Sequence, residues 1–337
     1  MRFVFLVQAS AQMGLGHLMR CQALAQQIVA DEMDAIFLLD QATHEFALAR
    51  HEWQGEIISH DYTANVTEQY QSLVRAISGP VDWLIIDGYQ FDAAYCNFWR
   101  ETGLKIALFD DGVHIESIEA DAILNAAAQP DAESNHLFGP EFRLLRREFS
   151  MVSPFPIEQR HHLTINFGGS DPMQLTIPVL QGLESMGFTA PIRVITGAAF
   201  PALDELKQII HSTKLTLQHV HDAQDMADVW SHAKLAVSAA GGSQFELAVC
   251  QTPAVVVVVA DNQVTASRQA LAEGWCKVFE LQGLAMAEQE VSIKTIAQTI
   301  CELWARPETL REMQQLIPHS YDAGGSVRVL NALMALS

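Results

Sequence analysis

The feature that most constrains this chain is the regular return of short apolar runs, each bounded by turn residues and alternating with segments of helical periodicity. Apolar runs of this length are typical of strands that are buried on both faces, as in parallel sheets covered by helices. The pattern therefore predicts an α/β architecture in which strands and helices alternate along the chain.

The alternation falls into two halves. In the first half we expect strands at 3–9, 35–39, 56–59, 82–88, 104–111 and 121–126. The stretch "SPFPIEQRHH" (153–162) contains two prolines and is typical of a linker. After it we expect strands at 163–167, 192–196, 214–220, 234–240 and 254–260, and later helices at 263–273, 290–316 and 326–336. These segments predict one Rossmann-like domain over residues 1–150, a second over 160–320, and a C-terminal helix over 321–337.

The composition limits the class of protein. A net charge of −20 argues against a general nucleic-acid binder, which needs basic side chains to replace counterions. It leaves a small anionic ligand open, because backbone amides and helix N-termini hold phosphate without lysine or arginine. The longest apolar run, at 253–260, is too short to span a membrane, and the N-terminus carries no signal-peptide pattern.

The cysteines point to the cell interior. The five of them are scattered, without the spacing of a metal site or a redox motif: Cys21, Cys96, Cys250, Cys276 and Cys301. Reduced thiols in a cytoplasmic protein without stable membrane association are therefore expected.

Three glycine-bearing turns follow predicted strands and open predicted helices. Glycine lets backbone amides approach an anion closely, and a helix N-terminus adds partial positive charge. The same turns can also be ordinary connections between a strand and a helix, without a role in ligand binding. Their residues are the first candidates for binding a phosphate-bearing ligand: Gly14, Gly16, Gly168, Gly169, Ser170, Gly241, Gly242 and Ser243. None of the turns is a dinucleotide fingerprint or a GK[ST] phosphate loop.

His17 follows the first turn and stands at the predicted start of a helix. Positive charge at a helix N-terminus favours a neutral imidazole that can accept a proton, so His17 is a candidate general base. The alternative is a surface histidine without a catalytic role.

Polar residues near two later strands form a second group of candidates. Glu246 lies three residues after Ser243, which fits either a capping box or a carboxylate that binds a ribose diol. Asn262 and Gln263 follow a buried strand and could bind a sugar or cap the next helix.

The remaining ionisable residues are less informative about function. Asp87, Asp110 and Asp111 stand at strand ends, where a carboxylate is either a site residue or a helix cap. The histidines lack companion ligands at metal spacing, and we interpret those at 161, 162, 219 and 221 as solvated or core residues. No metal ion is expected to be required.

A set of motifs, taken together in this order, resembles a known family. The motifs are "GLGHLMRC", "IIDGY", "GPEFRLLRREF", "NFGGSD", "SAAGGSQFELAVCQTPAVVVVVADNQ" and "DAGGSVRV". They resemble the UDP-sugar hydrolases of pseudaminic acid biosynthesis, which are related to the lipid II GlcNAc transferase. The resemblance implies a GT-B fold, with two Rossmann-like domains facing across a cleft.

The resemblance also implies an activity. The family hydrolyses UDP-2,4-diacetamido-2,4,6-trideoxy-β-L-altropyranose to UDP and the free sugar, by metal-independent attack of water at the anomeric carbon. A monomer acting on a small UDP-sugar, without a cofactor, is then expected. Two rivals remain open from the sequence: a glycosyltransferase that uses the same UDP-sugar site, and a binder of nucleotide sugars without catalysis.

Residue roles carry over by position. His17 matches the catalytic histidine of the family, and Tyr89 matches an aromatic residue near the reacting sugar. Glu246 matches a ribose-binding carboxylate and Asn262 an amide that contacts substrate. The turns at 168–170 and 241–243 match those that approach the nucleotide and its diphosphate.

The chain departs from the family pattern in its first half. Leu6 and Gln8 stand where the family usually has an arginine and an aspartate, and Gly88 stands where a histidine precedes the site tyrosine. Asn125 begins a stretch that usually carries three polar residues. These departures leave the identity of the sugar more open than the nucleotide.

Overall fold

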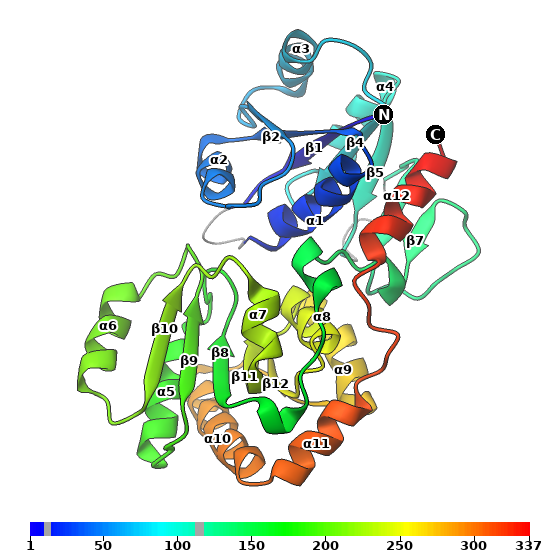
Figure 1. Cartoon of the computed structure of the whole chain (residues 1–337). Helices are drawn as coiled ribbons and strands as arrows, with labels where there is room; N and C mark the ends of the chain where they lie inside the picture. The colour runs from blue at the N-terminus through cyan, green and yellow to red at the C-terminus, as the bar shows by residue number, and fades with distance from the viewer. Residues whose placement is uncertain (10–14, 112–117) are drawn as a thin grey trace. The chain divides into compact units, whose positions relative to one another are not determined.

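The fold consists of two parallel sheets, each covered by helices, in a computed structural model that describes residues 1–9, 15–111 and 118–337 (Figure 1). Residues 1–150 together with 322–337 form one compact unit, the N-terminal domain, and residues 151–321 form the other, the C-terminal domain. Gly14 lies outside the described residues.

The N-terminal domain is built on a seven-stranded sheet with the strand order β3-β2-β1-β4-β5-β6-β7. Its elements are β1 (Arg2–Val7), α1 (Gly16–Ala30), β2 (Asp34–Leu39), α2 (Gln41–Leu48), β3 (Glu56–Ser59), α3 (Val66–Ala76), β4 (Trp83–Asp87), α4 (Ala93–Glu101), β5 (Lys105–Phe109), β6 (Ala122–Asn125), β7 (His136–Phe138), the 3₁₀ turns η1 (Pro140–Phe142) and η2 (Arg147–Met151), whose last residue falls in the other unit, and α12 (Gly325–Ala335).

The C-terminal domain is built on a six-stranded sheet with the order β10-β9-β8-β11-β12-β13. Its elements are η3 (Ile157–Gln159), β8 (His162–Asn166), α5 (Thr176–Ser185), β9 (Ile192–Thr196), α6 (Leu203–Ser212), β10 (Leu217–His221), α7 (Met226–Ser231), β11 (Ala233–Ala239), α8 (Gly242–Val249), β12 (Ala254–Val258), η4 (Asp261–Gln263), α9 (Val264–Glu273), β13 (Cys276–Glu280), α10 (Met286–Trp304) and α11 (Pro307–Leu316).

Both sheets of the described residues are parallel throughout, as the apolar runs predict. Parallel register places the carboxyl ends of the strands at one edge of each sheet. In the N-terminal sheet Val7, the last residue of β1, pairs with Asp87, the last of β4. This carboxyl edge is where α/β sheets bind ligands.

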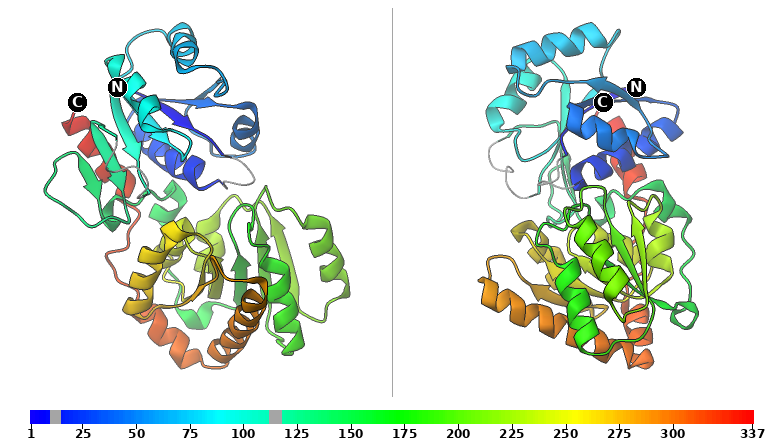
Figure 2. Two further views of the ribbon diagram at one scale, coloured as in Figure 1. Left: turned by 180° about the vertical axis from the view of Figure 1, so that it is seen from behind. Right: turned by 90° about the vertical axis from the view of Figure 1, so that its left-hand side faces the viewer.

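Each face of the N-terminal sheet has its own core. Helix α1 and α12 cover one face, with Leu24, Ile28 and Leu330 fully buried there. Helices α3 and α4 lie on the opposite face, and the ribbon can be followed from two further sides in Figure 2. They supply Leu73 and Trp99 to the core there. The last helix of the chain therefore completes the first domain, a pairing that the order of the sequence does not predict.

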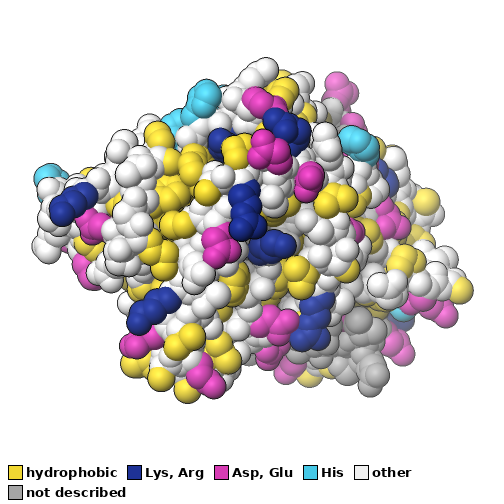
Figure 3. All heavy atoms as spheres, turned by 90° about the horizontal axis from the view of Figure 1, so that it is seen from below, with side chains coloured by type: hydrophobic (Ala, Val, Ile, Leu, Met, Phe, Trp, Pro, Cys, Tyr) yellow, Lys and Arg dark blue, Asp and Glu magenta, His cyan; other side chains and the backbone are white. Residues whose placement is uncertain are grey.

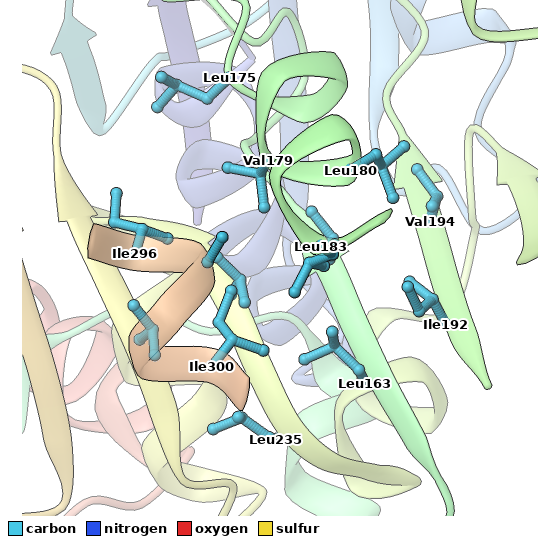
Figure 4. Packing of buried hydrophobic residues seen from close by; sticks show 14 of the residues in the cluster. Leu163, Leu175, Val179, Leu180, Leu183, Ile192, Val194, Leu235, Ile296 and Ile300 are labelled. Atoms are coloured by element: carbon cyan, nitrogen blue, oxygen red, sulfur yellow. The ribbon is translucent and has the colours of Figure 1, made fainter. Parts of the chain in front are cut away.

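The core of the C-terminal domain lies between its sheet and helices α5 and α10. Leu183 and Ile300 project from these two helices toward Leu163 of β8, and all three side chains are fully buried (Figure 4). Burial of each such side chain contributes about 1.5–3 kcal/mol, which fixes the sheet that carries the glycine turns.

Two expectations about the helices near the end of the chain need correction. A single helix over 290–316 is wrong, because the chain breaks at Arg306 and restarts at Pro307. Proline has no backbone N–H for the previous helix and is well suited to the first position of the next one. The sequence analysis also missed β7, β13 and α4, which are short or only partly apolar.

Candidate active site

The carboxyl edge of the N-terminal sheet carries a cluster of ionisable side chains around His17. His17 is only 7 % exposed, and its Nδ1 atom lies 2.6 Å from Oδ1 of Asp87. Helix α1 supplies the histidine and the end of β4 supplies the carboxylate, which is fully buried. The structure therefore gives His17 a carboxylate partner and does not leave it as an ordinary surface residue.

Arg20 lies one helical turn after His17 and joins two of the candidate carboxylates. Its Nε and Nη2 atoms donate to the two oxygens of Asp87 at 2.6 and 2.5 Å. Its Nη1 donates to Oδ1 of Asp111 at 2.7 Å. Forked contacts of this kind hold guanidinium and carboxylate in a defined geometry.

These contacts set the charge of Asp87. Burial by itself raises the pKa of a carboxyl group, but Arg20 and then His17, with their hydrogen bonds, hold the pKa of Asp87 well below its ordinary value. Burial likewise opposes the charge of Arg20, and the two carboxylates outweigh it, so the pKa of Arg20 is raised. Asp87 and Arg20 are therefore ionised across the physiological range.

Tyr89 completes the cluster. It lies two residues after the end of β4, its side chain is about half-buried, and its hydroxyl donates to Oδ2 of Asp111 at 3.1 Å. Partial burial of the phenol, followed by the charge of Asp111, raises the pKa of Tyr89 above its ordinary value, so the hydroxyl keeps its proton. The ring meets that of His17 edge to face at a centroid distance of 4.9 Å.

The structure thus brings His17 and Tyr89 together as the sequence predicts, and it resolves two of the three open aspartates. Asp87 and Asp111 both belong to this cluster, and among the described residues neither of them is the N-cap of a helix. Arg20 was missed as a functional candidate. The signal for it was its position three residues after His17, which places both side chains on one face of a helix.

The departures from the family pattern have structural explanations. Leu6 is fully buried in the core on one face of the sheet, so it cannot contact a substrate at the edge. Gln8 does lie at the edge, where its amide donates to Asp40, the N-cap of α2. At Gly88 the space of a side chain is filled by the amide of Gln90. Asn125 ends β6, and its side-chain oxygen accepts from the backbone amides of Ala127 and Ala128 in the turn that follows the strand.

The C-terminal domain carries the other two glycine turns at the carboxyl edge of its sheet. Gly241 has φ +100° and is the N-cap of α8, without a side-chain cap. Gly242 and Ser243 form the first turn of this helix. Uncapped amides at a helix start are suited to an anion.

The turn after β8 differs from the expected form. Gly168, Gly169 and Ser170 do follow the strand, but α5 begins only at Thr176. The carboxylate of Asp171 accepts from the amides of Leu175 and Thr176 at 2.8 and 2.9 Å, and so satisfies the start of the helix. A helix opened directly by the glycines is therefore wrong for this turn.

Glu246 does not form the capping box that its spacing allows. The N-cap is Gly241 and not Ser243, and Oε2 of Glu246 accepts from Nε1 of Trp230 at 3.0 Å. The indole is fully buried and belongs to α7, so this bond joins two helices beside the turn. The carboxylate is thereby oriented in place, which is compatible with binding a diol.

Gln263 links the two predicted binding segments of this domain. Its Oε1 accepts from the amide of Val259 at 2.9 Å, and its Nε2 lies against Gly241. Neither Asn262 nor Gln263 caps the following helix through its side chain. Asn262 is exposed on the turn between β12 and α9.

Two histidines of β10 contact a side chain at the end of the neighbouring strand β9. His219 and His221 contact the hydroxyl of Thr196 at 2.8 and 3.0 Å.

Within residues 1–9, 15–111 and 118–337, no group of three or more His, Cys, Asp or Glu side chains could hold a metal ion. Among the same residues, no helix is long and apolar enough to cross a membrane. Figure 3 shows one face on which acidic and basic side chains are interspersed.

The two parallel sheets with their helices define a GT-B fold, as expected. MurG of Acinetobacter baumannii matches over 99 % of both chains with a TM-score of 0.66 and 15 % identity. At this identity the similarity shows the fold alone.

Similar sequences are more specific. The chain is 25 % identical over 67 % of its length, and 81 % of the relative, to the UDP-2,4-diacetamido-2,4,6-trideoxy-beta-L-altropyranose hydrolase of Campylobacter jejuni. It is 23 % identical over 76 % of its length to an uncharacterised protein of Methanocaldococcus jannaschii, of which it spans 55 %. No family model matches the chain. The similarity to this UDP-sugar hydrolase and to MurG confirms the resemblance that the motifs indicate.

Proposed function

We propose that this protein is a UDP-sugar hydrolase. Its substrate is a UDP-linked 2,4-diacetamido-2,4,6-trideoxyhexose of the L-altrose type, and its products are UDP and the free sugar for nonulosonic acid biosynthesis. The observation that carries the proposal is the contact of 2.6 Å between His17 and the buried carboxylate of Asp87. The similarity to the hydrolase of Campylobacter jejuni supports the choice of substrate.

The histidine acts as the general base. With its Nδ1 proton donated to Asp87, the ring has a lone pair on Nε2 that can accept a proton from water. As the water oxygen bonds to the anomeric carbon, the bond from that carbon to the diphosphate breaks and UDP leaves with its electrons. Asp87 stabilises the imidazolium that forms, as a carboxylate does behind a catalytic histidine.

The C-terminal domain binds the nucleotide in this proposal. The first turn of α8 offers backbone amides to the diphosphate, and Glu246 accepts hydrogen bonds from the ribose hydroxyls. Glycine at 241 and 242 lets the phosphate approach the backbone. The proposal uses the hydroxyls of Ser170, which is buried, and of Ser243, in the first turn of α8, as further donors.

The test is turnover of the UDP-sugar in heavy-oxygen water without an added acceptor. Label in the free sugar, with unlabelled UDP and an inverted anomeric carbon before mutarotation, is the expected result. Label in the phosphate would mean attack at phosphorus and would contradict the role of His17. Turnover only after addition of an alcohol or lipid would identify a glycosyltransferase, and binding without turnover would identify a nucleotide-sugar binder. Several UDP-linked diacetamido sugars, compared in this assay, identify the preferred isomer.

A further inference from the structure

The side chains around His17 form a closed ring of contacts. His17 contacts Asp87, Asp87 contacts Arg20, Arg20 contacts Asp111, and Asp111 accepts from Tyr89. The ring of Tyr89 then returns to the ring of His17. Every member is thereby held from two sides, and Arg20 is the member that joins the two carboxylates.

The geometry also decides which nitrogen of His17 carries the proton. Nδ1 lies 2.6 Å from an oxygen of Asp87 and 3.0 Å from Nη2 of Arg20. An unprotonated Nδ1 would place its lone pair against a carboxylate oxygen at 2.6 Å, which is repulsive. Nη2 already has carboxylate acceptors in Asp87 at 2.5 Å and Asp111 at 3.2 Å, so it does not need Nδ1 as an acceptor. The proton therefore belongs on Nδ1, between the ring and Asp87.

This assignment depends on where Asp87 points. Both of its oxygens accept from Arg20, and Oδ2 also accepts from the thiol of Cys21 at 3.4 Å. Arg20 is in turn fixed by Asp111 and by stacking over Phe109, with its guanidinium 4.8 Å from the ring centroid. Without the fork of Arg20 the carboxylate would lose its strongest orienting contacts.

We propose that Arg20, clamped between Asp87 and Asp111, is a positioning residue that holds His17 in its Nδ1-protonated form with Nε2 facing the reaction. Arg20 does not act on the substrate itself in this scheme. The inference rests on the proposed function for its catalytic consequence, but the proton position on His17 is a property of the free protein.

The first experiment measures that property directly. Nitrogen-15 spectra of histidine-labelled protein report the tautomer of each ring, and the signal of His17 is identified by its loss in His17→Asn. We expect the Nδ1-protonated form in the wild type and a mixture of both tautomers in Arg20→Ala. An Nε2-protonated ring in the wild type, or an unchanged signal in Arg20→Ala, would overturn the inference even if no UDP-sugar is hydrolysed.

The second experiment measures the catalytic consequence. Arg20→Ala should lower kcat at least about tenfold, a part of the contribution of the general base, with little change in KM. Free guanidinium ion added to this variant should restore part of the loss. Arg20→Lys keeps the charge without the fork and should stay well below the wild type.

The controls separate positioning from loss of structure. Arg100→Ala removes an arginine paired with Glu119 in the same domain, and kcat should not change. If Arg20→Ala does not fold, Asp111→Asn removes one side of the clamp and tests the same ring. A raised KM with an unchanged kcat in Arg20→Ala would mean that Arg20 has no positioning role. Full activity of Arg20→Lys would mean the same. If wild-type protein hydrolyses no UDP-sugar, the proposed function fails while the nitrogen-15 result still decides this inference.

Discussion

The two domains share one architecture but differ in what they place at the carboxyl edge of the sheet. In the N-terminal domain the edge carries charged groups in contact with one another, with a buried Asp87 joined to His17 and Arg20. In the C-terminal domain the corresponding turns are built on glycines, with the backbone of α8 open at Gly241 and Gly242. The same sheet edge thus carries two different kinds of chemical group, which suit the two tasks of the proposed function.

The difference follows from what each task requires. A general base needs one oriented lone pair, and a buried carboxylate and guanidinium provide the orientation at the cost of desolvating charge. A diphosphate needs close approach to several N–H groups, which glycine permits and large side chains prevent. The proposed function assigns turnover to the first domain and nucleotide affinity to the second, and variants in either domain test that assignment.

The largest expected effect is on turnover, from His17→Asn. Loss of the general base should lower kcat on the order of a hundredfold or more and leave KM nearly unchanged, because the proposed function assigns nucleotide binding to the other domain. Steady-state kinetics with the UDP-sugar measure kcat and KM, and calorimetry with UDP measures nucleotide affinity. An active His17→Asn variant would remove the histidine from the mechanism.

The next effect is on affinity, from Glu246→Ala. Loss of a carboxylate that holds a ribose diol should weaken UDP binding by about 1.5–3 kcal/mol, measured by calorimetry. Because Glu246 also accepts from Trp230, the matched control is Trp230→Phe, which removes that bond and keeps the carboxylate. If Glu246→Ala lowers the melting temperature but not UDP affinity, the residue only joins α7 to α8.

Much of this comparison could be predicted from the sequence, because it depends on local patterns. Apolar runs indicate buried strands, and β3 begins and ends at the predicted residues, Glu56 and Ser59. The glycine turns were found because glycine is placed where the backbone needs φ above zero, as at Gly168 and Gly241.

The charged ring could be predicted only in part. Asp87 and Arg20 are 67 residues apart in sequence, and their contact exists because parallel register brings β4 beside β1 and the helix that follows β1. The pattern of a single sequence identifies candidate residues at strand ends, but it does not show which of their side chains contact one another in the fold. The placement of α12 on the first domain has the same cause, since tertiary packing and not chain order decides it.

A smaller effect on UDP affinity is expected from adding a methyl group at a glycine of the C-terminal domain. Two glycines distinguish a methyl group that would contact the ligand from one that would contact the protein itself. A Cβ at Gly242 would meet nothing within 4 Å, whereas one at Gly197 would lie 2.4 Å from Cα of Gly169. Gly242→Ala should therefore fold with an unchanged melting temperature yet bind UDP more weakly, because the methyl group occupies the place of the phosphate. Gly197→Ala should lower the melting temperature and disturb the turn at Gly169. Unchanged UDP affinity in a well-folded Gly242→Ala would remove the start of α8 from the diphosphate site.

The smallest expected effect is that of removing divalent metal ions. The carboxylates at the edge of the N-terminal sheet are already paired with a cation, since Asp87 and Asp111 both accept from Arg20. On the nucleotide side, amides at the start of α8 are expected to take the role that a metal ion plays for a diphosphate elsewhere. Dialysis against EDTA should therefore leave kcat and KM of the UDP-sugar reaction as they were, and added Mg²⁺ or Mn²⁺ should not raise the rate. A rate that falls on chelation and returns with either ion would mean that a metal neutralises the leaving UDP, and the division of tasks between charged and glycine-built edges would then be incomplete.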